Sequence, residues 1–106
     1  MISLAQYLDL WAGSESTRLA IAQTVQAIAS VSIEVSALIA EGDIAGALDQ
    51  AVGENVDGDT QKALDLQAND LFIKGLYSAP VAVLGSEESD SAVLLSDGAP
   101  LAVTLD

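Results

Sequence analysis

The amino-acid sequence predicts an α+β fold in which N-terminal helices pack on an antiparallel sheet. Apolar residues recur at steps of three and four over much of the first three quarters of the chain, which is the period of a helix. Short apolar runs separated by turn residues follow from residue 81 onward, which is typical of strands. Because the helical segments precede the strands, a layered α+β arrangement is favoured over alternating βαβ units.

The longest predicted helix covers about residues 17–41. Residues 11–16, which include a glycine and two serines, interrupt the apolar segment that precedes it. One face of this helix, apolar except for a serine, consists of Ile21, Val25, Ile28, Ser32, Val35 and Ile39. Gly42 and Asp43 are expected to end the helix, and core packing is the simplest interpretation of the face.

A second long helix is predicted over about residues 60–77. The segment before it, about residues 43–60, is rich in glycine and polar side chains and is expected to form a mobile loop, with a short helix at 44–48. Asp59 or Thr60 is expected to cap the N-terminus of the second helix, because both side chains can accept a hydrogen bond from a free backbone amide.

The strands are expected between residues 81 and 106. The apolar runs that predict them are residues 81–84, 92–95 and 101–105. Asp97-Gly98 is a turn signal between the second and third runs. We therefore expect consecutive strands to pair as an antiparallel meander.

Composition excludes several kinds of site. The 106 residues contain no cysteine and no histidine, so disulfides, thiolate metal sites, zinc triads and Ser-His-Asp triads are all ruled out. The formal net charge is −13, with three basic residues, which favours neither nucleic acid nor an anionic membrane as a partner. Acidic side chains suit hard cations such as Mg²⁺, although acidity also serves solubility alone.

No membrane span or signal peptide is expected. The most apolar candidate, residues 19–40, is interrupted by polar side chains and falls short of the roughly 20 apolar residues that a span requires. The N-terminus lacks a basic segment before an apolar core. These features predict a cytoplasmic chain.

Acidic side chains stand where backbone elements begin or end. Asp59 lies at the loop-to-helix junction, Glu87 and Glu88 follow the first strand, and Asp106 ends the last strand. Ligand sites are often built at such positions. Adjacent glutamates on an extended segment point to opposite sides, so one could hold a metal while the other handles a proton. On these residues alone, a solvated turn and a plain helix cap are the commoner interpretations.

Several short groups of residues also form an ordered pattern. They are Gly53-Glu-Asn55-Val56, Gly58-Asp59, Gln61-Lys62, Leu64-Asp65, Asn69-Asp70-Leu71 and Ser86-Glu87-Glu88. In these groups, in their order and in their separations, the sequence resembles the N-terminal part of the class 1 fructose-1,6-bisphosphatases. Asp106 corresponds to the first residue of that family's Asp-Pro-Leu-Asp-Gly-Ser-Ser motif. The resemblance implies an N-terminal fragment of a layered sugar-phosphatase fold.

The resemblance implies Mg²⁺-dependent hydrolysis of the 1-phosphate of fructose 1,6-bisphosphate, with Mn²⁺ as an alternative cation, in gluconeogenesis or carbon fixation. Asp59, Glu87 and Asp106 correspond to metal ligands, Asp59 from the mobile loop. Asp65 and Glu88 correspond to the catalytic pair that positions and deprotonates the attacking water. Such a mechanism is chemically sound without histidine, because bound metal ions acidify water and a carboxylate can accept its proton.

The resemblance further implies a small sugar bisphosphate as partner and a homo-oligomer for the full-length protein. The family's remaining phosphate contacts and its basic pocket would lie beyond residue 106, so the 106-residue chain is expected to have little or no phosphatase activity. AMP inhibition is not expected either, since Pro100-Leu101 stands where a Lys-Tyr pair would be. The alternatives are a related Mg²⁺-dependent inositol or sugar phosphatase and a non-catalytic acidic interaction module.

Overall fold

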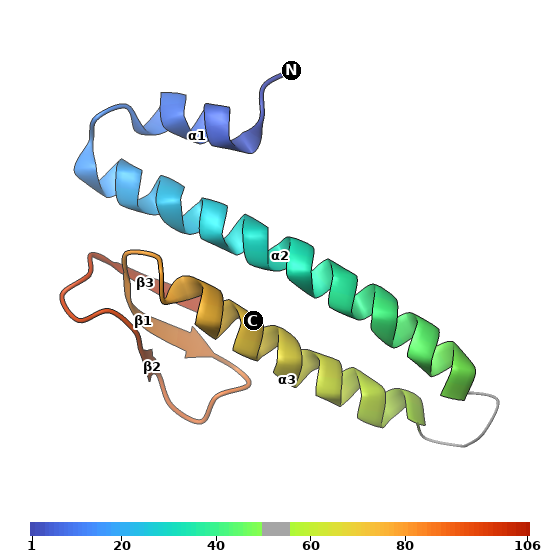
Figure 1. The fold of residues 1–106 in the computed structure, drawn as a ribbon. Coiled ribbons are helices and arrows are strands. Elements are labelled where there is room, and N and C mark those ends of the chain that lie inside the picture. Colours follow the sequence, from blue (N-terminus) through green and yellow to red (C-terminus); the bar gives the residue numbers. More distant parts are fainter. Residues whose placement is uncertain (50–55) are drawn as a thin grey trace.

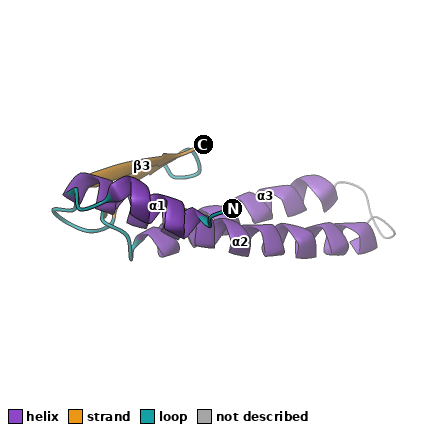
Figure 2. Ribbon diagram, turned by 90° about the horizontal axis from the view of Figure 1, so that it is seen from above, coloured by secondary structure: helices purple, strands orange, loops and turns teal. Residues whose placement is uncertain are grey.

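A computed structural model describes the backbone of residues 1–49 and 56–106, and the side chains of residues 1–41 and 61–106. Its elements are α1 (Leu4–Ala12), α2 (Ser16–Asp49), α3 (Val56–Leu76), β1 (Val81–Ser86), β2 (Val93–Leu94) and β3 (Leu101–Leu105). Figure 1 shows α2 and α3 side by side, with α1 along the N-terminal part of α2. Viewed from above, the helices form one layer and the sheet lies over it (Figure 2). The α+β class is confirmed.

The first helix, α1, begins at a capping box that the sequence analysis does not include. The Ser3 hydroxyl accepts a hydrogen bond from the Gln6 amide at 3.1 Å, and the Gln6 side chain accepts one from the Ser3 amide at 2.9 Å. Together they satisfy two amides that the helix itself leaves free. Gly13 ends the helix at φ 56°, a conformation that favours glycine. The apolar residues buried between α1 and α2 are Leu8, Ala12 and Ala22.

The two long helices extend further than predicted. Helix α2 begins at Ser16, close to the expected residue 17, but continues past Gly42 and Asp43 to Asp49. A single glycine costs a helix only about 1 kcal/mol, and the alanines and leucine that follow it favour the helical backbone. The separate short helix expected at 44–48 is therefore part of α2.

Helix α3 begins at Val56, so Asp59 lies inside its first turns and does not cap it. The loop predicted at 43–60 is thus shorter than expected, because helical backbone covers both of its ends. Its centre, residues 50–55, lies outside the described residues.

The sheet is mixed rather than antiparallel. Its strand order is β2-β1-β3, with β1 antiparallel to β2 and parallel to β3. A turn does occur at the predicted place, where Gly98 has φ 77°. After this turn the chain crosses to the edge of β1 opposite β2, and β3 pairs there with β1. The pairing of β3 with β1 is longer than one with the two-residue strand β2 could be.

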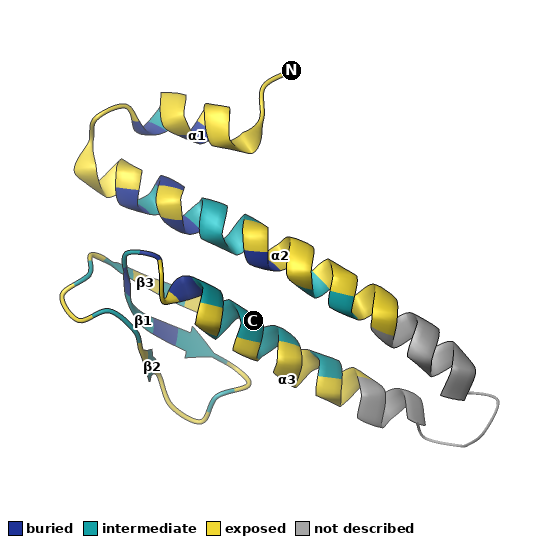
Figure 3. Cartoon of the chain, in the orientation of Figure 1, coloured by how far each residue is buried: buried dark blue, intermediate teal, exposed yellow. Residues whose placement is uncertain are grey.

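The main core joins α3, β1 and the middle of α2. Leu76, Ala79, Val81 and Leu84 form its buried centre, and Ala27 and Ile28 of α2 are among the side chains packed against it. Figure 3 shows the buried residues gathered along the α1–α2 contact and where α3 meets β1, whereas much of the described outer surface of α2 is exposed. The predicted apolar face of α2 therefore packs only in part, since Ile39 is 46% exposed.

One described segment, Ser16–Glu41 of α2, is long and apolar enough to cross a membrane by length and composition. The expectation that no stretch approaches a span is therefore wrong by this criterion. The core helix of a soluble protein and a signal sequence near the N-terminus meet the same test, so one such helix is weak evidence for a membrane.

The contact between α2 and α3 depends on a glycine. Val31 of α2 is 4% exposed, and a Cβ atom placed on Gly75 of α3 would overlap its Cγ2 atom. The absence of a side chain at Gly75 therefore permits the close approach of the two helices.

We expect Gly75→Ala to lower the free energy of unfolding by about 1–2 kcal/mol, since the overlap with Val31 outweighs the better helix propensity of alanine. Urea denaturation measures the change. Gly85→Ala is the matched control, because a Cβ there would meet Thr104 at an ordinary 3.6 Å. Equal free energies of unfolding for Gly75→Ala and Gly85→Ala would contradict the close approach of α2 and α3 at Gly75.

Candidate functional site

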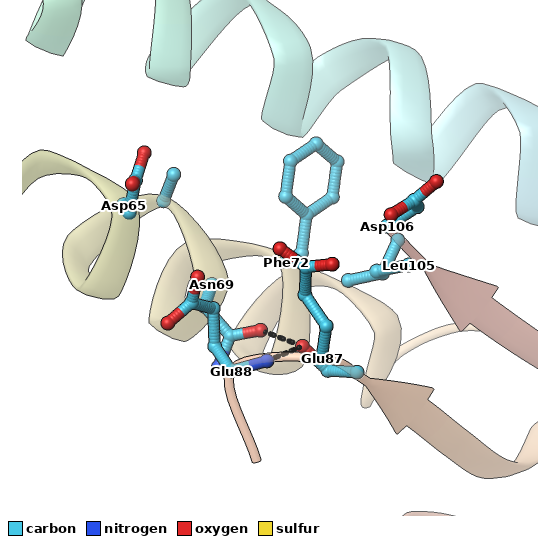
Figure 4. Close-up of a pocket in the computed structure, with 9 residues that line it drawn as sticks. Asp65, Asn69, Phe72, Glu87, Glu88, Leu105 and Asp106 are labelled. Carbon is cyan, nitrogen blue, oxygen red and sulfur yellow. Dashed lines mark hydrogen bonds between the residues drawn. The ribbon is translucent and has the colours of Figure 1, made fainter. Parts of the chain in front are cut away.

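A pocket of about 320 Å³ opens between α3 and the C-terminal ends of β1 and β3. Its lining residues are Asp65, Ala68, Asn69, Phe72, Ser86, Glu87, Glu88, Leu105 and Asp106. Figure 4 shows that they come from three separate parts of the chain, α3 and the ends of two strands. The pocket therefore exists only when the helix and the sheet pack together.

Four of the five side chains predicted from the sequence line this pocket. Asp65 comes from α3, Glu87 and Glu88 follow β1, and Asp106 follows β3. The side chain of Asp59, the fifth, lies outside the described residues. The structure thus gathers four of the acidic groups, while their roles as metal ligands or catalytic groups stay predictions.

The parallel pairing of β1 with β3 brings Glu87 and Asp106 together. Ser86 stands opposite Leu105 in the register, and the Glu87 amide donates a hydrogen bond to the Leu105 carbonyl at 3.4 Å. In the predicted meander, β2 would separate these strand ends by two strand spacings, about 9–10 Å. The correction to the strand order therefore brings the two carboxylates closer than the sequence analysis implied.

The acidic side chains repel one another. The pKa of Glu87 is raised, first because Asp106 shares a hydrogen bond with it and repels its negative charge. The charge of Glu88, a small loss of hydration and the charge of Asp65 raise the pKa further, in that order. Asp106 is thus the residue with the largest effect on the pKa of Glu87.

Two further polar residues of the pocket, Asn69 and Ser86, are not among the site residues predicted from the sequence. The Ser86 hydroxyl donates a hydrogen bond to the Asn69 side-chain oxygen at 2.5 Å and accepts one from the Glu88 amide at 3.3 Å. Figure 4 draws both bonds as dashed lines. The sequence does indicate that both residues lie near the predicted site. Asn69 follows Asp65 by one helical turn, and Ser86 directly precedes the two glutamates.

The donor chemistry of the pocket fits a hard divalent cation. Its polar side chains offer carboxylate, hydroxyl and amide groups, and Mg²⁺ prefers oxygen ligands. None of the nine described lining residues is basic, so a phosphate ester would meet only negative charge without a cation. In the arrangement shown, no three acidic side chains of the described residues converge on one ion. Among the described residues, a cation held by three acidic side chains would therefore require one of them to rotate.

Comparison with known proteins gives a consistent result. The chain is 42% identical over 106 residues to a protein of Rhodopseudomonas palustris (strain BisB18) named fructose-1,6-bisphosphatase class 1. It is 44% identical over 105 residues to such a protein of Xanthobacter autotrophicus and 42% over 104 residues to one of Methylorubrum extorquens (strain PA1). The resemblance to class 1 fructose-1,6-bisphosphatases is confirmed.

These matches cover 98–99% of this chain but only 31%, 28% and 30% of the three bisphosphatases. The chain therefore spans about a third of the length of the curated relatives it matches. No protein-family profile and no solved structure matches the chain. The similarity covers the first two helices, α1 and α2, as well as the segments that carry the short residue groups of the family pattern.

We expect Asp106→Asn to lower the pKa of Glu87 toward its ordinary value, because it removes the largest cause of the shift. A carbon-detected NMR titration of the glutamate carboxyl groups measures this. Because its pKa is higher in the folded chain than in the unfolded chain, Glu87 keeps its proton to a higher pH when the chain is folded. Its contribution to stability is therefore fully present below the pKa of unfolded glutamate. That contribution is lost as pH rises through the raised pKa of the folded chain.

Asp97→Asn is the control, because Asp97 is exposed in the turn between β2 and β3, outside the pocket. It should leave the titration of Glu87 unchanged. A Glu87 pKa that stays raised in Asp106→Asn would show that the two carboxyl groups are not in contact.

Proposed function

We propose that this chain supplies the metal-holding and water-activating carboxylates of a fructose-1,6-bisphosphatase. The reaction is Mg²⁺-dependent hydrolysis of fructose 1,6-bisphosphate to fructose 6-phosphate and phosphate. One observation carries the proposal, namely that the acidic side chains matching the family pattern line a single pocket. The names of the relatives favour this function over an inositol phosphatase or an acidic interaction module.

In this proposal Glu87 and Asp106 hold the divalent cation, Mg²⁺ or Mn²⁺, through carboxylate oxygens. Their contact across the ends of β1 and β3 is the basis for assigning them together. Asp59 is assigned as a further ligand by the family pattern alone. When bound, the cation supplies positive charge that neutralises the phosphoryl oxygens and acidifies water.

Asp65 and Glu88 position the attacking water, and one of them accepts its proton. The water oxygen forms a bond to the phosphorus of the 1-phosphate, while the bond from phosphorus to the sugar oxygen breaks. The sugar oxygen leaves as an alcohol after taking up a proton. The two carboxylates come from different elements, α3 and the turn after β1, so the helix–sheet packing sets their separation.

The chain does not by itself provide positive charge for the two phosphates of the substrate. Arg18, Lys62 and Lys74 are its three basic residues, and none lines the pocket among the described side chains. We therefore propose that the 106-residue chain alone has little or no activity. The longer protein is proposed to be a cytoplasmic homo-oligomer that acts in gluconeogenesis or carbon fixation.

A chimaera tests the function directly. The matched region of the Rhodopseudomonas palustris (strain BisB18) relative is replaced by this chain, and phosphate release from fructose 1,6-bisphosphate is measured with Mg²⁺. We expect activity in the chimaera, and Glu88→Gln should lower kcat by roughly 10²- to 10⁴-fold because it removes a proton acceptor. Glu87→Gln should raise the Mg²⁺ concentration needed for half-maximal rate.

Asp90→Asn is the matched control, because Asp90 is an exposed acid two residues after Glu88 and outside the pocket lining. It should retain the activity of the chimaera. A folded chimaera in which Glu88→Gln is as active as Asp90→Asn would refute the assigned role.

A further inference from the structure

We propose that Ser86 and Asn69 form a positioning pair that sets the distance between the acidic side chain on α3 and those after β1. Neither residue is assigned as a ligand or as a proton acceptor. Their hydrogen bond joins the helix to the sheet in the middle of the pocket. The inference rests on the proposed function, because it concerns how these carboxylates are arranged around a cation.

Packing alone does not hold the acidic groups. Asp65, Glu87, Glu88 and Asp106 are all exposed, whereas Asn69 and Ser86 are partly buried between the helix and the sheet. Exposed side chains on different elements keep a fixed separation only if the elements themselves are fastened nearby. The hydrogen bond between Ser86 and Asn69 links α3 to the end of β1 in this way, within the pocket.

On the helix side, the bond acts one turn away from Asp65. Asp65 and Asn69 are four residues apart in α3, so they share one face of the helix. A displacement of the Asn69 turn away from the sheet would carry Asp65 with it, since the helical backbone between them is hydrogen-bonded throughout.

On the sheet side, the bond acts on the peptide that links the two glutamates. The Ser86 hydroxyl uses its proton for Asn69 and a lone pair for the Glu88 amide. The preceding amide, that of Glu87, is held by the Leu105 carbonyl. Two successive amides are therefore held in place, that of Glu87 by β3 and that of Glu88 by the Ser86 side chain.

Partners of this kind matter for cation affinity even though they do not touch the ion. Hydrogen bonds that orient ligands are worth about 10- to 100-fold in metal affinity in characterised metal sites. Ser86→Ala removes the hydroxyl and with it both bonds. Ser86→Thr keeps the hydroxyl at the end of a strand, where a β-branched residue is favoured.

The test is a calorimetric titration of the 106-residue chain and its variants with Mn²⁺. We expect Ser86→Ala and Asn69→Ala each to weaken Mn²⁺ binding by about 10-fold. Ser86→Thr should restore most of the parent affinity. Because both alanine variants break the same bond, the double variant should bind nearly as well as Ser86→Ala.

Ser89→Ala is the matched control, since Ser89 lies in the same turn but outside the pocket lining. It should bind Mn²⁺ like the parent, and thermal unfolding should show each variant folded. Parent affinity in a folded Ser86→Ala, with weakened binding in Glu87→Gln, would overturn this inference while leaving the proposed function standing. A parent chain that does not bind Mn²⁺, or a Glu87→Gln variant that binds as well as the parent, would overturn both.

Discussion

The packing of β1 against the C-terminal turn of α3 is the interaction on which the rest of the structure depends. Leu76, Val81 and Leu84 are fully buried at this contact. Removing a side chain of this size from water contributes about 1.5–3 kcal/mol. The chain turns back between Leu76 and Val81, where the Ala79 amide donates to the Leu76 carbonyl at 3.1 Å. The strand must therefore run back along the helix that precedes it.

That constraint explains where the pocket lies. A strand advances about 3.3 Å per residue, so Ser86 to Glu88 lie roughly 17–23 Å from the start of β1. A helix advances about 1.5 Å per residue, which places Asp65 and Asn69 roughly 10–17 Å before the end of α3. The distance along the strand and the distance along the helix are similar, so the glutamates after β1 lie beside the face of α3 that carries Asp65 and Asn69. Parallel pairing then brings the end of β3 to the same place.

The same arrangement has an electrostatic cost. Four acidic side chains line one small pocket, and the pKa of Glu87 is raised first by its hydrogen bond with Asp106 and then by the negative charges around it. The apolar core holds the helix and the sheet together, and the Ser86–Asn69 bond joins them at the pocket, so these groups stay close despite their like charges. A divalent cation between Glu87 and Asp106 would replace the repulsion by attraction. The close approach of the acidic side chains is thus unfavourable in the chain alone, but it would favour the binding of a cation.

The sequence predicted the site better than the elements that form it. The acidic groups were identified from short residue patterns, which need no knowledge of element boundaries. Helix ends were less accurate, because Gly42 and Asp43 are weak stop signals inside a segment that otherwise favours helix. The turn at Gly98 was predicted, but a turn does not determine which edge of β1 the following strand will pair with. The Ser86–Asn69 bond depends on that tertiary packing, and the positions of the two residues in the sequence do not by themselves predict that they bond to each other.

We propose that the pocket at the ends of β1 and β3 binds a divalent cation. Paramagnetic line broadening by Mn²⁺, followed residue by residue in an amide NMR spectrum, tests it most directly. The account predicts that substoichiometric Mn²⁺ first broadens the amides of Glu87, Glu88 and Asp106 and those around Asp65, while α1 stays sharp. Uniform broadening over the many acidic residues of the surface, or broadening centred away from the pocket, would contradict it.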